Sequence, residues 1–194
     1  MNYKEYEKKA ITTKAYHEKV AIPYVVLGLC GELGETYEKL DQVDSVEDEK
    51  KLLGEISKEI GDQLWYLASI RVELDLQLEE GWNWTEKEPE LSAASIGVKL
   101  PSEIGKIAEQ VKKWLRDDWK DGEVNTFPEK RKTAVLSAWK NIWKYLNGLA
   151  DSLGLDIEEI AIQNNEKLAS RKQRNVINGC LLYTSDAADD RISV

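Results

Sequence analysis

Apolar residues recur along the chain at spacings of three and four, and short polar breaks separate the stretches in which they do so. This period of about 3.6 residues is typical of amphipathic helices and predicts six of them. Pro23 lies where the second helix should begin, Pro101 should interrupt the fourth, and Asp156 is placed to cap the sixth. The predicted helices are Tyr3–Lys19, Pro23–Leu40, Leu52–Leu78, Leu91–Asp118, Lys130–Leu153 and Asp156–Lys172.

The pattern predicts an all-α protein that resembles a four-helix bundle. The composition agrees, because 42% of the residues are apolar, 32% are charged and only 12 are glycine and 4 proline, too few for a turn-rich β sandwich. Residues 1–179 should form the domain. Residues 180–194 show no helical period, and we expect them to be a non-native tail.

Charge and residue usage exclude several classes of protein. A net charge of −9 argues against a nucleic-acid-binding surface, which requires a basic face. One histidine, His17, is too few for the zinc and di-iron sites that need at least two. Two cysteines make no disulfide framework, which favours a reducing compartment and a cytoplasmic protein. The longest apolar run is far shorter than the roughly 20 residues of a membrane span.

Two pairs of acidic residues could carry chemistry: Glu32 with Glu35, and Glu59 with Asp62. Each pair has the i, i+3 spacing that places both carboxylates on one face of a helix. If the two helices pack antiparallel, four carboxylates converge, and they need a cation to remain ionised together. A site that offers only oxygen ligands favours Mg²⁺ or Mn²⁺ over zinc.

Solvated helix faces are the alternative explanation of these pairs. With 36 acids in 194 residues, chance alone yields roughly seven pairs at this spacing. The setting of the two pairs is less ordinary, because both interrupt apolar runs and both have glycines beside them. A carboxylate in an apolar helix face is costly unless it has a partner. The residues alone leave both interpretations open.

Longer motifs around the acids resemble a known family. The segments Gly28–Glu35, Glu59–Ala68 and Leu149–Ala161, followed by Asn164, Lys167 and Arg171, resemble the MazG-type nucleotide pyrophosphohydrolases of the all-α NTP pyrophosphatase superfamily. The resemblance spans about residues 3 to 178. It implies Mg²⁺-dependent hydrolysis of an NTP or dNTP to the monophosphate and pyrophosphate, in control of the nucleotide pool.

The resemblance also implies roles for residues. Glu32, Glu35, Glu59 and Asp62 would bind the metal, and Glu32 would activate the water. Asn164, Lys167 and Arg171 would contact the substrate. Alternatives within the same fold are a dUTPase-like or an alarmone-directed hydrolase. A catalytically silent helical interaction protein is the alternative outside enzymes.

The chain departs from the short form of the family, because about eighty residues separate its acidic motif from its closing helix. An internal duplication explains this, with half one at about 1–85 and a degenerate half two at about 90–178; a large insertion is the alternative. In half two, Glu103, Lys106, Ala138 and Asn141 would occupy the acidic positions. The two halves would form a pseudo-dimer within one chain, and a homodimer is a further candidate state.

Half two would supply phosphate contacts to a single composite site. Its basic residues Lys112, Lys113 and Arg116 are the candidates for this role. An acidic metal cluster needs cations opposite it to hold the far end of a triphosphate. A solvated helix face is the alternative for these three residues.

Overall fold

The computed structural model describes residues 1–42, 49–87, 91–120 and 126–174. Within these ranges the chain is helical and contains no strand, which confirms the all-α prediction. None of these helices is both long and apolar enough to cross a bilayer. The predicted tail, 180–194, lies outside the described residues. The helices are α1 (Tyr3–Ile11), the short 3₁₀ helix η1 (Glu18–Val20), α2 (Ala21–Leu40), α3 (Glu49–Glu73), α4 (Ala93–Asp117), α5 (Glu129–Ser152) and α6 (Ile157–Gln173).

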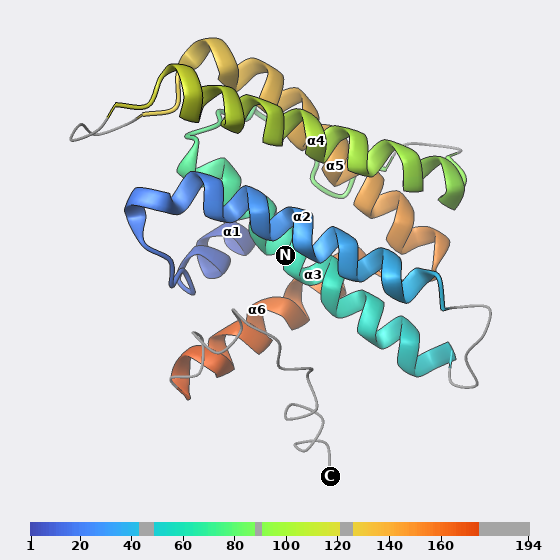
Figure 1. Cartoon of the computed structure of the whole chain (residues 1–194). Helices are drawn as coiled ribbons and strands as arrows, with labels where there is room; N and C mark the ends of the chain where they lie inside the picture. The colour runs from blue at the N-terminus through green and yellow to red at the C-terminus, as the bar shows by residue number, and fades with distance from the viewer. Residues whose placement is uncertain (43–48, 88–90, 121–125, 175–194) are drawn as a thin grey trace.

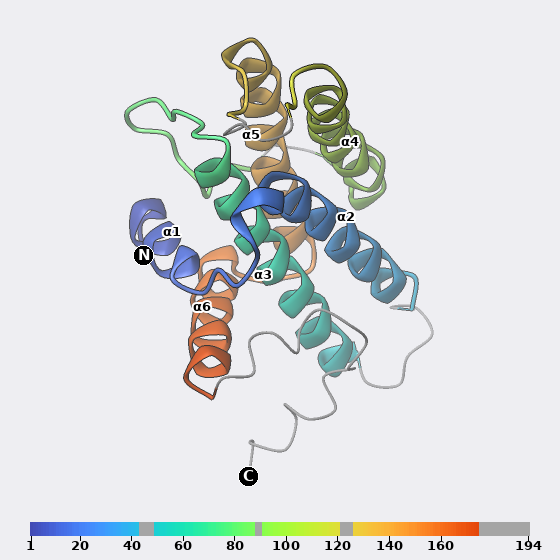
Figure 2. The same ribbon diagram turned by 60° about the vertical axis from the view of Figure 1, so that its left-hand side comes forward.

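Two antiparallel hairpins, α2–α3 and α4–α5, form the body of the molecule (Figure 1). The hairpins meet mainly through α2 and α4, and α3 also contacts α5. The helices α1 and α6 cover α3 on the side away from α4 (Figure 2). By sequence α6 belongs to half two, but it packs on α1 and α3 of half one. Helix α3 is therefore the centre of the fold.

The core follows the apolar stripe of α3. Ile56, Ile60 and Leu64 are fully buried on this stripe, as the helical spacing predicted. Each such side chain stabilises the fold by about 1.5–3 kcal/mol when it leaves water. Trp139 of α5 joins the stripe, and its indole N–H donates to the carbonyl of Leu67 at 2.8 Å. This bond ties the second hairpin to the central helix.

The first helix is shorter than predicted: α1 ends at Ile11 and not at Lys19. The hydroxyl of Thr12 donates to the carbonyl of Lys9, and that of Thr13 to the carbonyl of Ala10. The indole N–H of Trp65 also donates to the Ala10 carbonyl. Side chains therefore satisfy the last carbonyls of α1, so no further helical turn is required.

The third helix ends at Glu73, five residues before the predicted Leu78. Asp75 adopts a left-handed conformation with φ of 50°. The N–H of Leu76 bonds to the carbonyl of Arg71 at 2.9 Å, and the N–H of Asp75 bonds to that of Val72 at 3.2 Å. These two bonds form a Schellman cap, which glycine usually makes. An aspartate in this position gives no strong sequence signal.

Pro101 does not interrupt α4, so that prediction was wrong: the helix is continuous from Ala93 to Asp117. Pro101 itself is exposed, whereas Leu100 and Ile104 on either side of it are buried in the core. The packing of these apolar neighbours outweighs the one backbone hydrogen bond that proline removes.

Gly28 provides a test of the close packing of α2 on α3. A Cβ at this position would lie 2.2 Å from the ring of Tyr66. We expect Gly28→Ala to lower the free energy of unfolding by about 1–3 kcal/mol, because the aromatic ring must move. In Gly54→Ala, the matched control within α3, the new Cβ meets open space. Urea denaturation should show that this control is neutral or slightly stabilised.

Candidate metal and phosphate site

Three of the four predicted acids converge where α2 crosses α3. Carboxylate oxygens of Glu32, Glu59 and Asp62 lie within 4.8 Å of one another. Glu59 is buried, whereas the other two are half-buried. The fourth acid, Glu35, is exposed and lies outside this group. We call Glu32, Glu59 and Asp62 the acidic cluster.

A buried polar contact fixes the register of α2 on α3 beside the acidic cluster. The amide of Gln63, which is fully buried, donates to the hydroxyl of Thr36 at 2.7 Å. This hydroxyl in turn donates to the backbone carbonyl of Glu32 at 2.8 Å. A slip of either helix would leave a buried amide unpaired, which costs about 1–3 kcal/mol.

Helix α6 contributes an amide and a cation to the acidic cluster. The amide nitrogen of Asn164 donates to Asp62 at 2.6 Å, and the ammonium of Lys167 lies 2.7 Å and 2.9 Å from the two Asp62 oxygens. Gly61 permits this approach, because a Cβ there would lie 3.0 Å from the Cβ of Asn164. The structure thus brings two of the predicted substrate residues to the predicted metal ligands.

A second cation, Lys39, was not predicted from the sequence. It lies one turn after Glu35 on α2 and forms an ion pair with Glu59. Its position seven residues after Glu32, on the same face of the helix, was a signal that could have identified it. Lys39 and Lys167 each neutralise one carboxylate of the acidic cluster.

Glu32 has no cationic partner in the part of the chain that the structure describes. Burial, the charge of Asp62 and a hydrogen bond to Glu59 raise the pKa of Glu32 to about 9. Burial and the charge of Glu59 also raise the pKa of Glu35. Glu32 therefore carries a proton at neutral pH, which relieves the repulsion within the acidic cluster.

The donor set fits a hard divalent cation. Its ligand atoms are carboxylate oxygens, which suit Mg²⁺ or Mn²⁺ better than zinc. The carbonyl oxygen Oδ1 of Asn164 is buried beside them and accepts no hydrogen bond. Such an unsatisfied acceptor fits a site that is completed by a bound ligand or its water. A cation would also replace the proton on Glu32.

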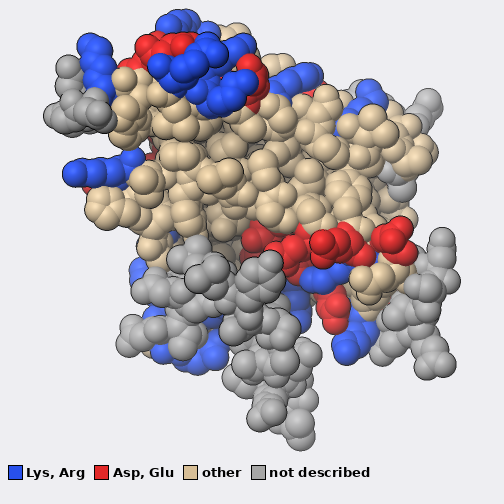
Figure 3. All heavy atoms as spheres, in the orientation of Figure 1, with Lys and Arg blue, Asp and Glu red and all other residues tan. Residues whose placement is uncertain are grey.

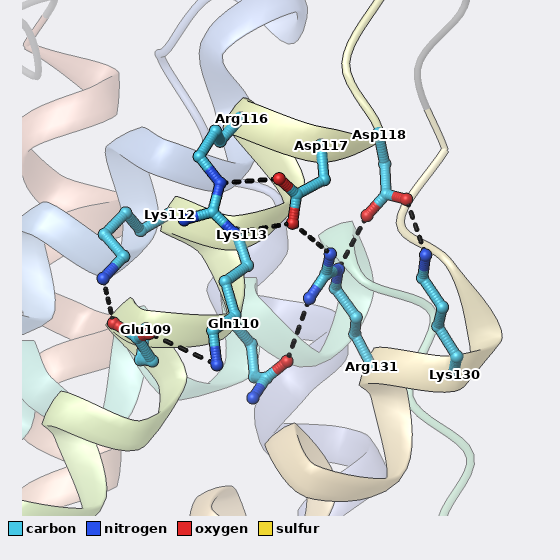
Figure 4. Close-up of polar contacts among 9 residues, drawn as sticks. All are labelled: Glu109, Gln110, Lys112, Lys113, Arg116, Asp117, Asp118, Lys130 and Arg131. Atoms are coloured by element: carbon cyan, nitrogen blue, oxygen red, sulfur yellow. Dashed lines mark hydrogen bonds and ion pairs between the residues drawn. The ribbon is translucent and has the colours of Figure 1, made fainter.

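The basic residues predicted on α4 have partners close to them on that helix. Lys112 and Lys113 pair with Glu109, and Arg116 pairs with Asp117. Figure 4 shows this group at the end of α4, next to the start of α5.

These residues also lie away from the acidic cluster. Gly97 of α4 lies beside Tyr37 of α2, where a Cβ would be 3.7 Å from the tyrosine ring. From there Lys112 is fifteen residues, or about 22 Å, further along the axis of α4. Glu32 lies only five residues before Tyr37. Figure 3 shows the acidic residues over α2 and α3 on one side and the basic residues over the end of α4 on the other.

The remaining predicted residues lie as follows. Arg171 is half-buried on α6, one turn after Lys167. In the second hairpin Lys106 pairs with Glu103 at 2.7 Å, while Ala138 is buried in the core and Asn141 is half-buried. Among the described residues, these four positions of half two form no acidic cluster.

Comparison with known proteins finds one similar protein of a phage. The chain is 38% identical over 89 residues to the Gene 37 protein of Mycobacterium phage L5, and the match covers 46% of this chain and 72% of that protein. No protein-family profile and no solved structure matches the chain.

The raised pKa of Glu32 makes the stability of the metal-free protein depend on pH. Because its pKa is about 9 when folded against an ordinary 4.5, the stability from its proton is complete below pH 4.5 and is lost as the pH rises through 9. Urea denaturation in chelator should show Glu32→Gln losing less stability than wild type between pH 5 and 9. Glu38→Gln, an exposed acid on α2, is the control. Identical slopes for wild type and Glu32→Gln would contradict the assignment.

Proposed function

We infer a function from the site, because the chain belongs to the same family as the Gene 37 protein of Mycobacterium phage L5, whose name states no activity. We propose that the chain is a Mg²⁺-dependent nucleoside triphosphate pyrophosphohydrolase. The reaction would convert an NTP or dNTP and water into the monophosphate and pyrophosphate, in control of the nucleotide pool. The observation that carries the proposal is the convergence of Glu32, Glu59 and Asp62 beside Lys167. The resemblance of the acidic motifs to the MazG-type enzymes supports it.

The acidic cluster would hold the metal, and Glu35 would join from the rim of the site. Mn²⁺ is an acceptable substitute, because it accepts the same oxygen ligands. When bound, the cation supplies positive charge to the triphosphate and to the departing pyrophosphate. Glu59 and Asp62 are placed on consecutive turns of α3, so both carboxylates can serve one site.

Glu32 is our candidate for the group that takes a proton from the attacking water. Its raised pKa favours the protonated form, and the positive charge of a bound cation would lower that pKa and release the proton. The carboxylate left behind is half-buried and can orient a water towards the α-phosphate. The proton of that water passes to Glu32, and the P–O bond to pyrophosphate breaks.

Lys39 and Lys167 are our candidates for holding the phosphates. In the structure they form ion pairs with Glu59 and Asp62. Once a divalent cation neutralises these acids, the two ammonium groups are free to bind phosphate oxygens. Arg171 lies one turn further along α6 and extends the same basic face. Half two would then contribute through α6 and not through Lys112 and its neighbours on α4.

Two tyrosines beside the acidic cluster are candidates for contacts to the base. Tyr24 and Tyr66 are half-buried, and their ring centroids lie 6.4 Å apart. The charges of Glu32 and Asp62, after burial and Tyr24, contribute to the raised pKa of Tyr66, so this ring is close to the acids. Aromatic faces of this kind stack on nucleobases. Preference for dUTP or for an alarmone would depend on this region.

We also propose that the second hairpin is a degenerate copy of the first, within one MazG-like fold. The hairpins have similar lengths and are packed through their equivalent first helices, α2 and α4. In the second hairpin the pairing of Lys106 with Glu103 replaces the repulsion of two acids by a local ion pair. The loss of acidic positions there would leave one metal site in each chain.

The first test is the metal dependence and the products of the reaction. Activity on a panel of nucleoside triphosphates should require Mg²⁺ or Mn²⁺ and fall at least 100-fold in Glu59→Gln and Asp62→Asn. Ion-exchange chromatography should find a monophosphate and pyrophosphate. Glu166→Gln, an exposed acid on α6, is the control and should retain full activity.

Two results would contradict the proposal. Turnover that persists in chelator would exclude the metal role, and a diphosphate with orthophosphate would exclude cleavage at the α-phosphate. Calorimetry separates the silent interaction protein from the enzyme, because a chain that binds no Mg²⁺ in the millimolar range has no working site.

The second test concerns the two lysines. Lys167→Ala and Lys39→Ala should each raise KM roughly 10- to 100-fold, the cost of a lost charged hydrogen bond. The affinity for Mg²⁺ without nucleotide should persist or increase, because a competing cation has been removed. Lys172→Ala, an exposed lysine at the end of α6, is the matched control. An unchanged KM in both variants would remove the lysines from the phosphate site.

A further inference from the structure

The largest uncharged area in the view of Figure 3 extends over α2 and α4, between an acidic and a basic edge. The residues that form this area are exposed and uncharged, and they follow the same spacing on both helices. We define the α2–α4 face by Leu27, Cys30 and Gly34 on α2 and by Val98, Pro101 and Gly105 on α4. Leu27 is 71% exposed and Val98 is 75% exposed, the highest values among the large apolar side chains of the described residues.

Both triplets have the spacing i, i+3, i+7, which is the repeat that helices use to pack against other helices. Each triplet begins with a large residue, Leu27 or Val98, and ends with a glycine, Gly34 or Gly105. A Cβ at either glycine would meet nothing within 4 Å. Packing within the chain therefore does not require these glycines, although each costs about 0.5–1 kcal/mol in a helix relative to alanine.

We propose that the α2–α4 face binds a second copy of this chain in a two-fold symmetric dimer. Because α2 and α4 run in opposite directions, Leu27 lies at the same end of the face as Gly105, and Val98 lies at the same end as Gly34. A two-fold axis along the helices places α2 of one copy on α4 of the other. Each large side chain then enters the recess above a glycine of the partner, so the face is complementary to itself.

Charge favours the same axis. Glu35 flanks the face on the outer edge of α2, and Lys99 and Lys106 flank it on the outer edge of α4. The two-fold axis brings the acidic edge of one copy to the basic edge of the other. Each triplet covers about 10 Å of helix axis, so the six residues form the centre of the interface, and the flanking turns of α2 and α4 supply the rim that an ordinary dimer of ~800 Å² per copy requires.

This inference uses no residue of the acidic cluster, and its test changes no residue of the proposed site, so it can fail or hold independently of the proposed function. Sedimentation equilibrium of the full chain should give twice the chain mass of 22.1 kDa at micromolar concentration. Leu27→Lys with Val98→Lys should weaken the dimer at least 100-fold. Both positions are exposed, so the fold should survive, as circular dichroism would show. Thr133→Lys with Ala169→Lys adds the same charge on α5 and α6 and should leave the dimer intact.

A second variant guards against a folding defect in the first. Gly105→Gln fills the recess in open space and replaces a helical glycine, so it should fold well and still weaken the dimer at least tenfold. In Cys180→Ser, which leaves Cys30 as the one thiol, the reaction of Cys30 with a maleimide should slow as the dimer forms. A wild-type chain that stays monomeric up to about 100 µM, or a Gly105→Gln dimer of unchanged affinity, would overturn the proposal.

Discussion

Repulsion between carboxylates at the crossing of α2 and α3 is the constraint on which the rest of the site depends. Three acids whose oxygens lie within 4.8 Å of one another cannot all remain charged without compensation. Three features of the structure compensate this charge: Lys39 pairs with Glu59, Lys167 pairs with Asp62, and the raised pKa of Glu32 favours its protonated form. A single divalent cation would replace all three together, which couples metal binding to proton release and to the freeing of two lysines.

The same constraint explains the position of the last helix. Without α6 the carboxylate of Asp62 would lose both the amide of Asn164 and the ammonium of Lys167. Gly61, on α3 beside Asp62, is the small residue that lets α6 come close enough to make these contacts. The packing of α6 on α3 therefore neutralises charge at the site in addition to burying the apolar face of α6. Residues near the end of the described chain thus complete a site whose carboxylates come from α2 and α3.

Sequence patterns predicted the helices well, because the apolar stripe of α3 and the cap at Asp156 follow directly from helical spacing and side-chain chemistry. The errors lie at helix ends and at Pro101. The end of α1 depends on a contact from Trp65, which is more than fifty residues away. The end of α3 depends on Asp75 in a conformation that glycine usually adopts. Tertiary contacts decide both, and a local pattern does not contain them.

At the candidate site too, the features that depend on local helical spacing were predicted and those that depend on tertiary packing were not. The i, i+3 rule placed Glu59 and Asp62 on one face of α3, because the rule is a property of the helix itself. Glu32 joins them because α2 packs antiparallel on α3, as the prediction assumed. The same rule treated Glu35 as equivalent, although the helix turns that carboxylate towards solvent. The resemblance to a family brought Asn164 and Lys167 to the site, where the structure also places them. Whether a lysine faces a distant acid or one on its own helix depends on packing, and sequence alone gave no basis for that choice.

The two helical hairpins differ in how their charged side chains are paired. In the first, α2 and α3 direct acids towards each other, and the charge is compensated by Lys39 of α2, by Lys167 of α6 or by a cation. In the second, Lys106 pairs with Glu103 on its own helix, and Glu109 likewise holds Lys112 and Lys113. Among the described residues, the second hairpin therefore has no cluster of carboxylates that requires a cation. It can serve as a stable support for α2, and the acids that need a partner are confined to one side of the molecule.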